Sequence, residues 1–159
     1  MINRTFDADI NTMFDLWTNP AHFAQWLPPV GMTMEYLRAD IRPGGSSFFC
    51  MSGNGLTMYG RGNYQKIQKP NLIVYTQSFC DKDEQPARHP LAPTWPAEML
   101  TTVTLTEEEP NRTRVTVQWQ VHGEATAVER ETFHQGKPGM TQGWTGSFDK
   151  LEALLPTQA

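Results

Sequence analysis

Side chains that could bind a metal ion or act as a nucleophile are few and lie far apart in the sequence. The four histidines are His22, His89, His122 and His134, and none lies at short ligand spacing from another histidine or from a cysteine. Metal sites usually draw such ligands in closely spaced pairs. Cys50 follows Phe49 within an apolar run, which favours a packed, inert thiol. With no phosphate-binding loop or dinucleotide fingerprint either, we expect no metal site and no cofactor.

Four polar residues on predicted strands are the remaining candidates for acid–base chemistry: Tyr64, Tyr75, Gln77 and Glu98. An apolar cavity would raise the pKa of a carboxyl group toward neutrality and suit it to proton transfer. Residues of this kind are also common inside sheets, where their hydrogen bonds are satisfied locally. Both interpretations stay open, and we assign no catalytic residue.

Methionine and aromatic side chains are the more informative set, because strand alternation turns many of them inward. Methionine is flexible and suits apolar binding sites of irregular shape. The alternative is an ordinary hydrophobic core, which any chain of this size needs. We take as candidate ligand-binding residues Phe49, Met51, Met58, Tyr64, Tyr75, Gln77, Phe79, Met99, Trp119, Met140, Trp144 and Phe148.

Length and charge restrict the class of protein. A chain of 159 residues is long enough for one well-buried domain, so we expect a single domain over residues 1–159. Thirteen basic and seventeen acidic residues give a net charge of −4 without basic clusters, which argues against nucleic acid as a partner. No stretch approaches the roughly 18 apolar residues that span a bilayer, and no signal peptide is visible. We expect no membrane insertion, a cytoplasmic location and reduced cysteines.

The first third of the chain predicts one strand and two short helices. Weak alternation over residues 2–7 indicates an edge strand, and Asp9 has the position of a helix N-cap. Asn19 and Pro20 then break the helix and leave room for a second short one that ends near Trp26.

Strand patterns follow up to residue 122. Met32, Met34 and Tyr36 alternate, and the pair Asn54-Gly55 is a strong hairpin signal, because both positions tolerate positive φ. Residues 81–96 contain four prolines and no periodicity, and so predict a loop. The remaining strands are predicted at 46–52, 57–68, 72–80, 98–108 and 112–122.

The C-terminal segment predicts a long helix that contains glycines. Its apolar residues recur at spacings of three and four, Pro138 supplies a start and Pro156 a stop. Gly139, Gly143 and Gly146 fall on one strip of this helix, although each costs roughly 0.5–1 kcal/mol relative to alanine. The strip either lets the helix pack closely on the sheet or forms one wall of a cavity.

Four groups of residues, in this order and spacing, resemble the helix-grip superfamily of START-like and Bet v-like proteins (SRPBCC). The closest likeness is to the group named for the activator of the ninety-kilodalton heat-shock protein ATPase. The groups are Leu16-Trp17-Thr18-Asn19-Pro20 followed by Trp26, residues 40–45 (DIRPGG) leading to Met51, Gly62-Asn63-Tyr64 followed by Lys69-Pro70, and Gly139-Met140 with Gly143-Trp144 and residues 148–151 (FDKL).

The resemblance implies an α+β helix-grip fold, in which a curved antiparallel β-sheet wraps around a long C-terminal α-helix and two short helices follow the first strand. Many relatives hold a hydrophobic small molecule in an apolar cavity between these layers, which favours the cavity interpretation of the glycine strip. The loop at 81–96 is longer than the resemblance implies. We interpret it as an inserted surface loop, with a lid as the alternative.

Three functions are compatible with these observations. The first is a soluble protein that binds a small hydrophobic molecule and requires no catalysis. The second is a cyclase or hydrolase that uses Tyr64, Tyr75 and Glu98 on a cavity-bound substrate. The third, implied by the resemblance alone, is a chaperone-associated module that regulates the heat-shock protein ATPase. We rank chaperone contact last, because the chain lacks the Asn-rich, Trp-His-Trp motif that the named activator also uses.

Overall fold

The computed structural model describes residues 1–28, 31–53, 55–88 and 92–155, and in this part of the chain seven strands form one antiparallel sheet. The strand order is β1-β7-β6-β5-β4-β3-β2. The elements in chain order are β1 (Ile2–Phe6), α1 (Ile10–Thr18), α2 (Pro20–Trp26), β2 (Met32–Ala39), β3 (Ser46–Gly53), β4 (Leu56–Gln68), β5 (Leu72–Cys80), β6 (Glu98–Glu109), β7 (Arg112–Val121) and α3 (Ala127–Leu154).

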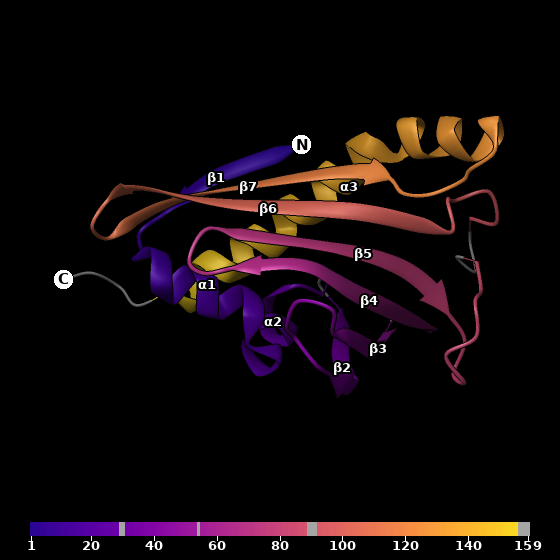
Figure 1. Cartoon of the computed structure of the whole chain (residues 1–159), viewed down its shortest axis with the longest axis horizontal. Coiled ribbons are helices and arrows are strands. Elements are labelled where there is room, and N and C mark those ends of the chain that lie inside the picture. The colour runs from indigo at the N-terminus through magenta and orange to yellow at the C-terminus, as the bar shows by residue number, and fades with distance from the viewer. Residues whose placement is uncertain (29–30, 54, 89–91, 156–159) are drawn as a thin grey trace.

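The long helix α3 crosses behind the curved sheet, and its C-terminal half runs toward α1 and α2 (Figure 1). An antiparallel sheet with one apolar face needs such a cover, because that face is otherwise exposed to water. This arrangement of a curved sheet, two short helices after the first strand and one long C-terminal helix confirms the predicted helix-grip fold.

Local capping explains where the two short helices begin. The Asp9 carboxylate accepts a hydrogen bond from the Thr12 backbone N–H at 3.0 Å, which satisfies a donor that the first helical turn leaves free. Asn19 accepts in the same way from the Ala21 N–H at 3.0 Å, and Pro20 occupies the first turn of α2. Both predicted helices are therefore confirmed, with the break where the sequence places it.

Strand pairing follows the predicted alternation. β3 and β4 form the expected hairpin, in which Met51 is paired with Met58 and Gly55 adopts a φ of 76°. Asn54, the other residue of the hairpin signal, lies outside the described residues, as do His89 and Pro156. The predicted bounds of the later strands agree with the structure to within one residue.

The core lies between the sheet and α3. Val103 pairs with Val117 and Leu105 pairs with Val115, and all four side chains are buried. From α3, Phe148 and Leu151 are fully buried against this layer. Burying an aliphatic or aromatic side chain of this size contributes about 1.5–3 kcal/mol, so these residues hold the helix on the sheet.

The prediction that the C-terminal helix begins at Pro138 is wrong. Helix α3 begins at Ala127 and continues through Pro138, which is exposed. Thr126 forms a capping box: its hydroxyl accepts from the Glu129 N–H at 3.1 Å, and the Glu129 carboxylate accepts from the Thr126 N–H at 2.9 Å. The Thr-x-x-Glu spacing was the sequence signal for this earlier start.

Candidate ligand-binding pocket

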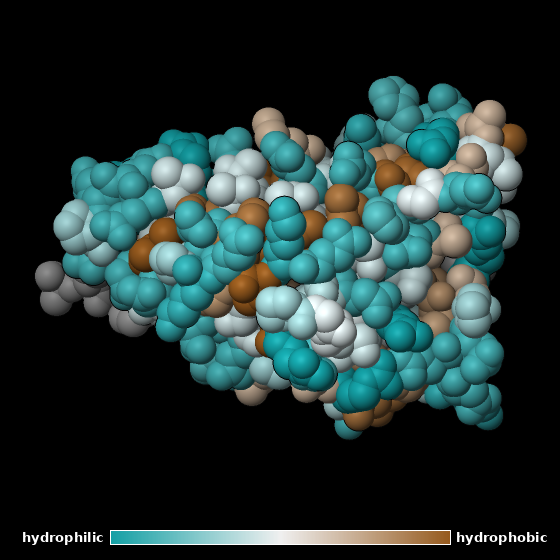
Figure 2. Space-filling view, in the orientation of Figure 1, coloured by the Kyte–Doolittle hydropathy of each residue, from teal (hydrophilic) through white to brown (hydrophobic). Residues whose placement is uncertain are grey.

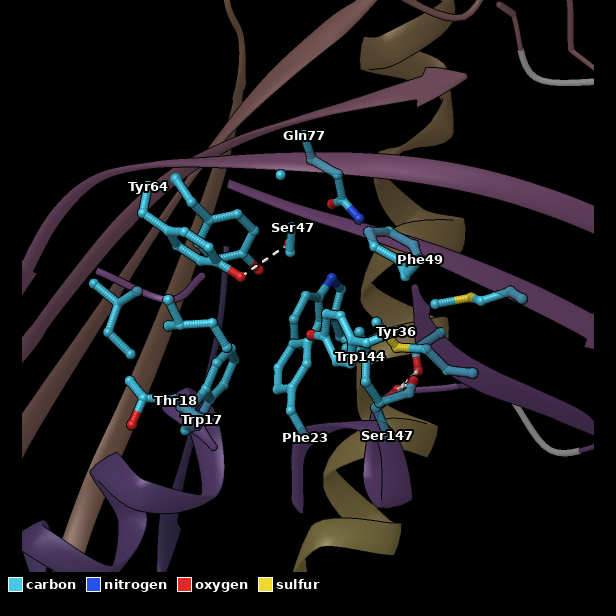
Figure 3. Close-up of a pocket in the computed structure, with 18 of the residues that line it drawn as sticks. Trp17, Thr18, Phe23, Tyr36, Ser47, Phe49, Tyr64, Gln77, Trp144 and Ser147 are labelled. Carbon is cyan, nitrogen blue, oxygen red and sulfur yellow. Dashed lines mark hydrogen bonds between the residues drawn. The ribbon is translucent and has the colours of Figure 1, made fainter. Parts of the chain in front are cut away.

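A pocket of about 290 Å³ lies between the sheet and the three helices (Figure 3). We call it the main pocket. Its walls come from α1 and α2 on one side, strands β2 to β5 on another, and the C-terminal half of α3. The pocket therefore combines segments that are far apart in the sequence.

Trp144 of α3 is the centre of an aromatic wall. Its ring stacks on Trp17 of α1 at 5.6 Å between centroids and 15° between planes, and on Trp119 of β7 at 6.3 Å and 30°. Trp17 and Trp144 both line the main pocket, whereas Trp119 supports Trp144 from behind. Stacked aromatic pairs contribute about 0.5–1.5 kcal/mol beyond their buried area, so the contacts with Trp17 and Trp119 help to hold Trp144 in place.

Three tyrosines place hydroxyl groups in the main pocket. Tyr64 and Tyr75 lie side by side on β4 and β5, with ring centroids 6.1 Å apart, and Tyr36 reaches in from β2. The Tyr64 hydroxyl is hydrogen-bonded to the Ser47 hydroxyl at 3.1 Å (Figure 3). Among the described residues, the Tyr36 hydroxyl has no hydrogen-bond partner.

All three phenols remain protonated at neutral pH. Burial raises the pKa of Tyr36 well above its ordinary value, and its neighbours Tyr64 and Tyr75 raise it further. Burial likewise raises the pKa of Tyr75 and Tyr64, against smaller lowering effects of hydrogen bonds with Thr101 and Ser47. An uncharged phenol is a hydrogen-bond donor and acceptor, so these groups suit neutral polar atoms of a ligand.

The main pocket contains no charged side chain among its described lining residues, and none of these residues is a histidine or a cysteine. An ionised ligand would therefore lose its hydration without gaining an opposite charge, which is costly. Across the described residues, no group of three or more His, Cys, Asp or Glu side chains could hold a metal ion. The described lining of the pocket therefore suits a neutral molecule better than an ion.

A second pocket of about 200 Å³ adjoins the main pocket. Phe49, Met51 and Gln77 line both pockets. Beyond them the second pocket is lined chiefly by Met58, Phe79, Pro96 and Met99.

Ten of the twelve candidate residues line one or both pockets. The residues that line the main pocket are Phe49, Met51, Tyr64, Tyr75, Gln77, Met140 and Trp144, and those that line the second pocket but not the main one are Met58, Phe79 and Met99. Trp119 and Phe148 line neither and belong to the core behind Trp144. That these ten residues bind a ligand stays a prediction.

The acid–base set of Tyr64, Tyr75 and Glu98 is not assembled in the structure. Gln77 pairs with Met99 and Ser78 with Glu98 across β5 and β6, so Glu98 lies on the opposite face of the sheet from Gln77. There Glu98 lines a separate, charged pocket with Arg61 and Glu84. The two tyrosines are thus without the carboxylate that the enzymatic hypothesis required.

Sequence reasoning missed the lining residues from the first helices and β2: Trp17, Phe23 and Tyr36. All three were visible as apolar or aromatic positions, but spacing along one helix or strand does not say whether such a face packs in a core or borders a pocket.

The glycine strip of α3 is only in part a pocket wall. An added Cβ atom would meet nothing within 4 Å at Gly139, Gly143 or Gly146, so the close-packing interpretation is wrong. Only Gly143 of these three lines the main pocket. Gly139 is exposed to solvent, and the cavity interpretation therefore holds for one position of the strip.

The family model described as Activator of Hsp90 ATPase homolog 1-like protein matches residues 7–156. The chain belongs to this family. The match includes every described residue that lines the main pocket, and it agrees with the resemblance that the sequence motifs suggested. Among curated proteins, none matches the chain significantly.

Solved structures of similar fold come from several bacteria. A protein from Arthrobacter aurescens has a TM-score of 0.79 and 23% identity, over 96% of this chain and 82% of that one. A protein from Mycobacterium smegmatis has a TM-score of 0.75 and 19% identity, over 99% and 90%. A member named for the same family, from Silicibacter pomeroyi, has a TM-score of 0.71 and 19% identity, over 96% and 93%. At these identities the likeness concerns the fold alone.

Within the described residues, no helix of this family member is long and apolar enough to cross a membrane. The face drawn in Figure 2 is mostly hydrophilic, with hydrophobic residues in small separate patches.

Proposed function

We propose that this family member binds a small, neutral, predominantly apolar molecule in the main pocket and that it needs no catalytic step to function. The observation that carries the proposal is the composition of the pocket wall: aromatic and aliphatic side chains, three protonated phenols and no charged group among the described lining residues. Apolar pockets with a few polar groups are the usual form of small-molecule sites. The family's fold, which is typically a ligand-binding one, supports the same conclusion.

The uncharged wall defines which molecules should bind. A neutral aromatic ring with a hydroxyl or carbonyl group can pack against the edge of Trp144 and exchange hydrogen bonds with Tyr36 or the Ser47–Tyr64 pair. Its carboxylate analogue would have to leave water without a cationic partner. Selection against charge is therefore the property that distinguishes this site from a nonspecific apolar patch.

Methyl 4-hydroxybenzoate and the 4-hydroxybenzoate anion test this selection, because they share a ring and differ in charge. We expect the ester to raise the melting temperature and to give a saturable signal in isothermal titration calorimetry, whereas the anion gives neither. A ligand at about 100 times its Kd stabilises a folded protein by about 2.7 kcal/mol, which is readily measured. Equal binding of the two compounds, or no binding by this ester, 4-ethylphenol and indole, would contradict the proposal.

The family description names a chaperone ATPase activator, so chaperone regulation is the competing function. It predicts that the purified protein changes the ATPase rate of its cognate ninety-kilodalton heat-shock protein. Such a change, unaffected when Gly143→Leu fills the main pocket, would favour the chaperone function over ligand binding.

A further inference from the structure

The main and second pockets meet at three side chains that line both: Phe49 and Met51 of β3 and Gln77 of β5. We call these three residues the waist. Figure 3 shows Gln77 reaching from β5 toward Phe49, with Tyr64 and Ser47 on the main-pocket side. The waist separates two spaces that are both apolar in most of their lining.

Phe49 fits at the waist because its neighbour on the paired strand β4 is a glycine. Phe49 pairs with Gly60 of β4, and a Cβ atom on Gly60 would come within 2.7 Å of Cε2 of the Phe49 ring. The ring therefore lies against bare backbone, and the edge of Tyr36 contacts it at 6.1 Å between centroids. Gly60, which has no side chain, therefore leaves room for the Phe49 ring against the sheet.

Polar groups are distributed unevenly along the two pockets. Among the described residues, the Gln77 carboxamide has no hydrogen-bond partner at the waist, and the Tyr36 hydroxyl has none in the main pocket. The far part of the second pocket is formed chiefly by Met58, Phe79, Pro96 and Met99. A molecule that spans both spaces would meet donors in the main pocket and at the waist, and thioether and aromatic surface beyond it.

We propose that the two pockets form one site for an elongated neutral molecule with a compact head group, a carbonyl group and an apolar chain. The head lies in the main pocket beside Trp144, the carbonyl accepts a hydrogen bond from the Gln77 carboxamide, and the chain lies in the second pocket against Met58 and Met99. This inference rests on the proposed function of the main pocket and adds the shape and polarity of the ligand.

The segment just before β6 borders the second pocket. Pro96 of the loop lines the second pocket and is fully buried. The neighbouring Trp95 packs on Phe133 of α3 with centroids 5.5 Å apart, and Arg88 forms an ion pair with Glu129. Arg88 and Trp95 thus hold this part of the loop on α3, next to Pro96 at the edge of the second pocket.

A series of n-alkyl 4-hydroxybenzoates, from methyl to octyl, tests the length of the site. In the unmodified protein, affinity should rise about fourfold for each methylene that leaves water, until the second pocket is filled. Met99→Trp fills that pocket and should abolish the rise while leaving affinity for the methyl ester within about twofold. Val128→Trp adds the same ring at a position that is 61% exposed, and should behave like the unmodified protein.

Gln77→Met tests the hydrogen bond at the waist, because the two side chains are similar in size. It should weaken binding of the butyl ester about three- to tenfold. The affinity for 4-butylphenol, which has no carbonyl group, should stay almost unchanged. An equal loss for both compounds would show that Gln77 acts only through packing and would remove the carbonyl from the proposal.

The outcomes separate this inference from the proposed function. Binding of the methyl ester without a gain on lengthening, or an undiminished gain in Met99→Trp, overturns the two-pocket site and leaves the main pocket intact. No binding of any ester overturns both. Should Met99→Trp fail to fold, Met58→Trp fills the same pocket from β4 and carries the same expectation.

Discussion

The indole of Trp95 lies over Gly136 of α3, where an added Cβ atom would come within 2.6 Å of Cζ3 of the ring. Among the four glycines of α3 at positions 136, 139, 143 and 146, this is the one that permits a close approach. The contact joins the loop before β6 to the helix, next to Phe133. A side chain at position 136 would have to displace the loop.

Replacing Gly136 with alanine should therefore loosen the loop. The helix gains about 0.5–1 kcal/mol of propensity, but overpacking against Trp95 costs about 1–3 kcal/mol, so we expect a small net loss of stability. Limited trypsin digestion should then cleave faster after Lys82 or Arg88. Gly139→Ala is the matched control: it meets nothing within 4 Å and should raise the unfolding free energy by about 0.5–1 kcal/mol. Equal stabilisation by both changes would show that Trp95 does not hold the loop.

Gly143→Leu should remove ligand binding without removing stability. Position 143 has open space around its Cβ and lines the main pocket beside Trp144, so the leucine side chain would enter the pocket. We expect an unfolding free energy equal to or above that of the unmodified protein, and affinity for methyl 4-hydroxybenzoate reduced about tenfold or more. Gly139→Leu, at a position of the same helix that does not line the main pocket, should leave affinity unchanged. A large loss of stability in Gly143→Leu would mean that the space is already filled.

The tyrosines predict how stability changes at alkaline pH. The pKa values of Tyr36, Tyr64 and Tyr75 are raised in the folded state, chiefly by burial, above the value of about 10 of an unfolded chain. The unfolded state loses these protons first, so stability is fully present below about pH 10 and falls as the pH rises further.

Absorbance of phenolate near 295 nm checks this prediction. We expect most of the phenolate signal to appear together with unfolding, measured by circular dichroism, rather than before it. Tyr36→Phe should reduce the amount of stability that the protein loses above about pH 10. Full ionisation of the tyrosines in a still-folded protein would contradict the burial of these groups.

Ser147→Ala should weaken the contact between α3 and the end of α2. The Ser147 hydroxyl donates to the Leu27 carbonyl oxygen at 2.6 Å, and its side chain is buried. Loss of this hydrogen bond should lower the unfolding free energy by about 1 kcal/mol in urea denaturation. Affinity for the methyl ester should fall as well, because both residues line the main pocket. Thr145→Ala is the control, since the Thr145 hydroxyl donates to the Thr141 carbonyl within its own helix.

Local signals in the sequence predicted most of the fold. Asp9 and Asn19 mark helix starts, and strand alternation correctly placed Phe49 and Met51 on the inward face of β3. These signals succeed because capping and pleat periodicity involve residues close in sequence. The start of α3 was misplaced because a proline was weighed above the capping box of Thr126 and Glu129.

The candidate site was predicted in its residue types but not in its boundaries. Sequence periodicity placed Trp119 and Phe148 on the inward side, and both are indeed buried, but Trp144 lies between them and the main pocket. Depth within a layer depends on how α3 lies across the sheet, and that angle has no local signal. The same reason explains why Trp17 and Phe23 went unrecognised as part of the wall.

By itself, the sequence determined the order of elements, the inward face of most strands and the apolar character of the protein's interior, because these follow from spacing along one chain segment. Only the tertiary structure decided that Phe49 faces Gly60, that Gln77 lies at the junction of two pockets, and that Glu98 lies on the opposite face. Those relationships depend on strand register and on packing between distant segments, where a shift of one residue would turn every side chain to the other face of the sheet.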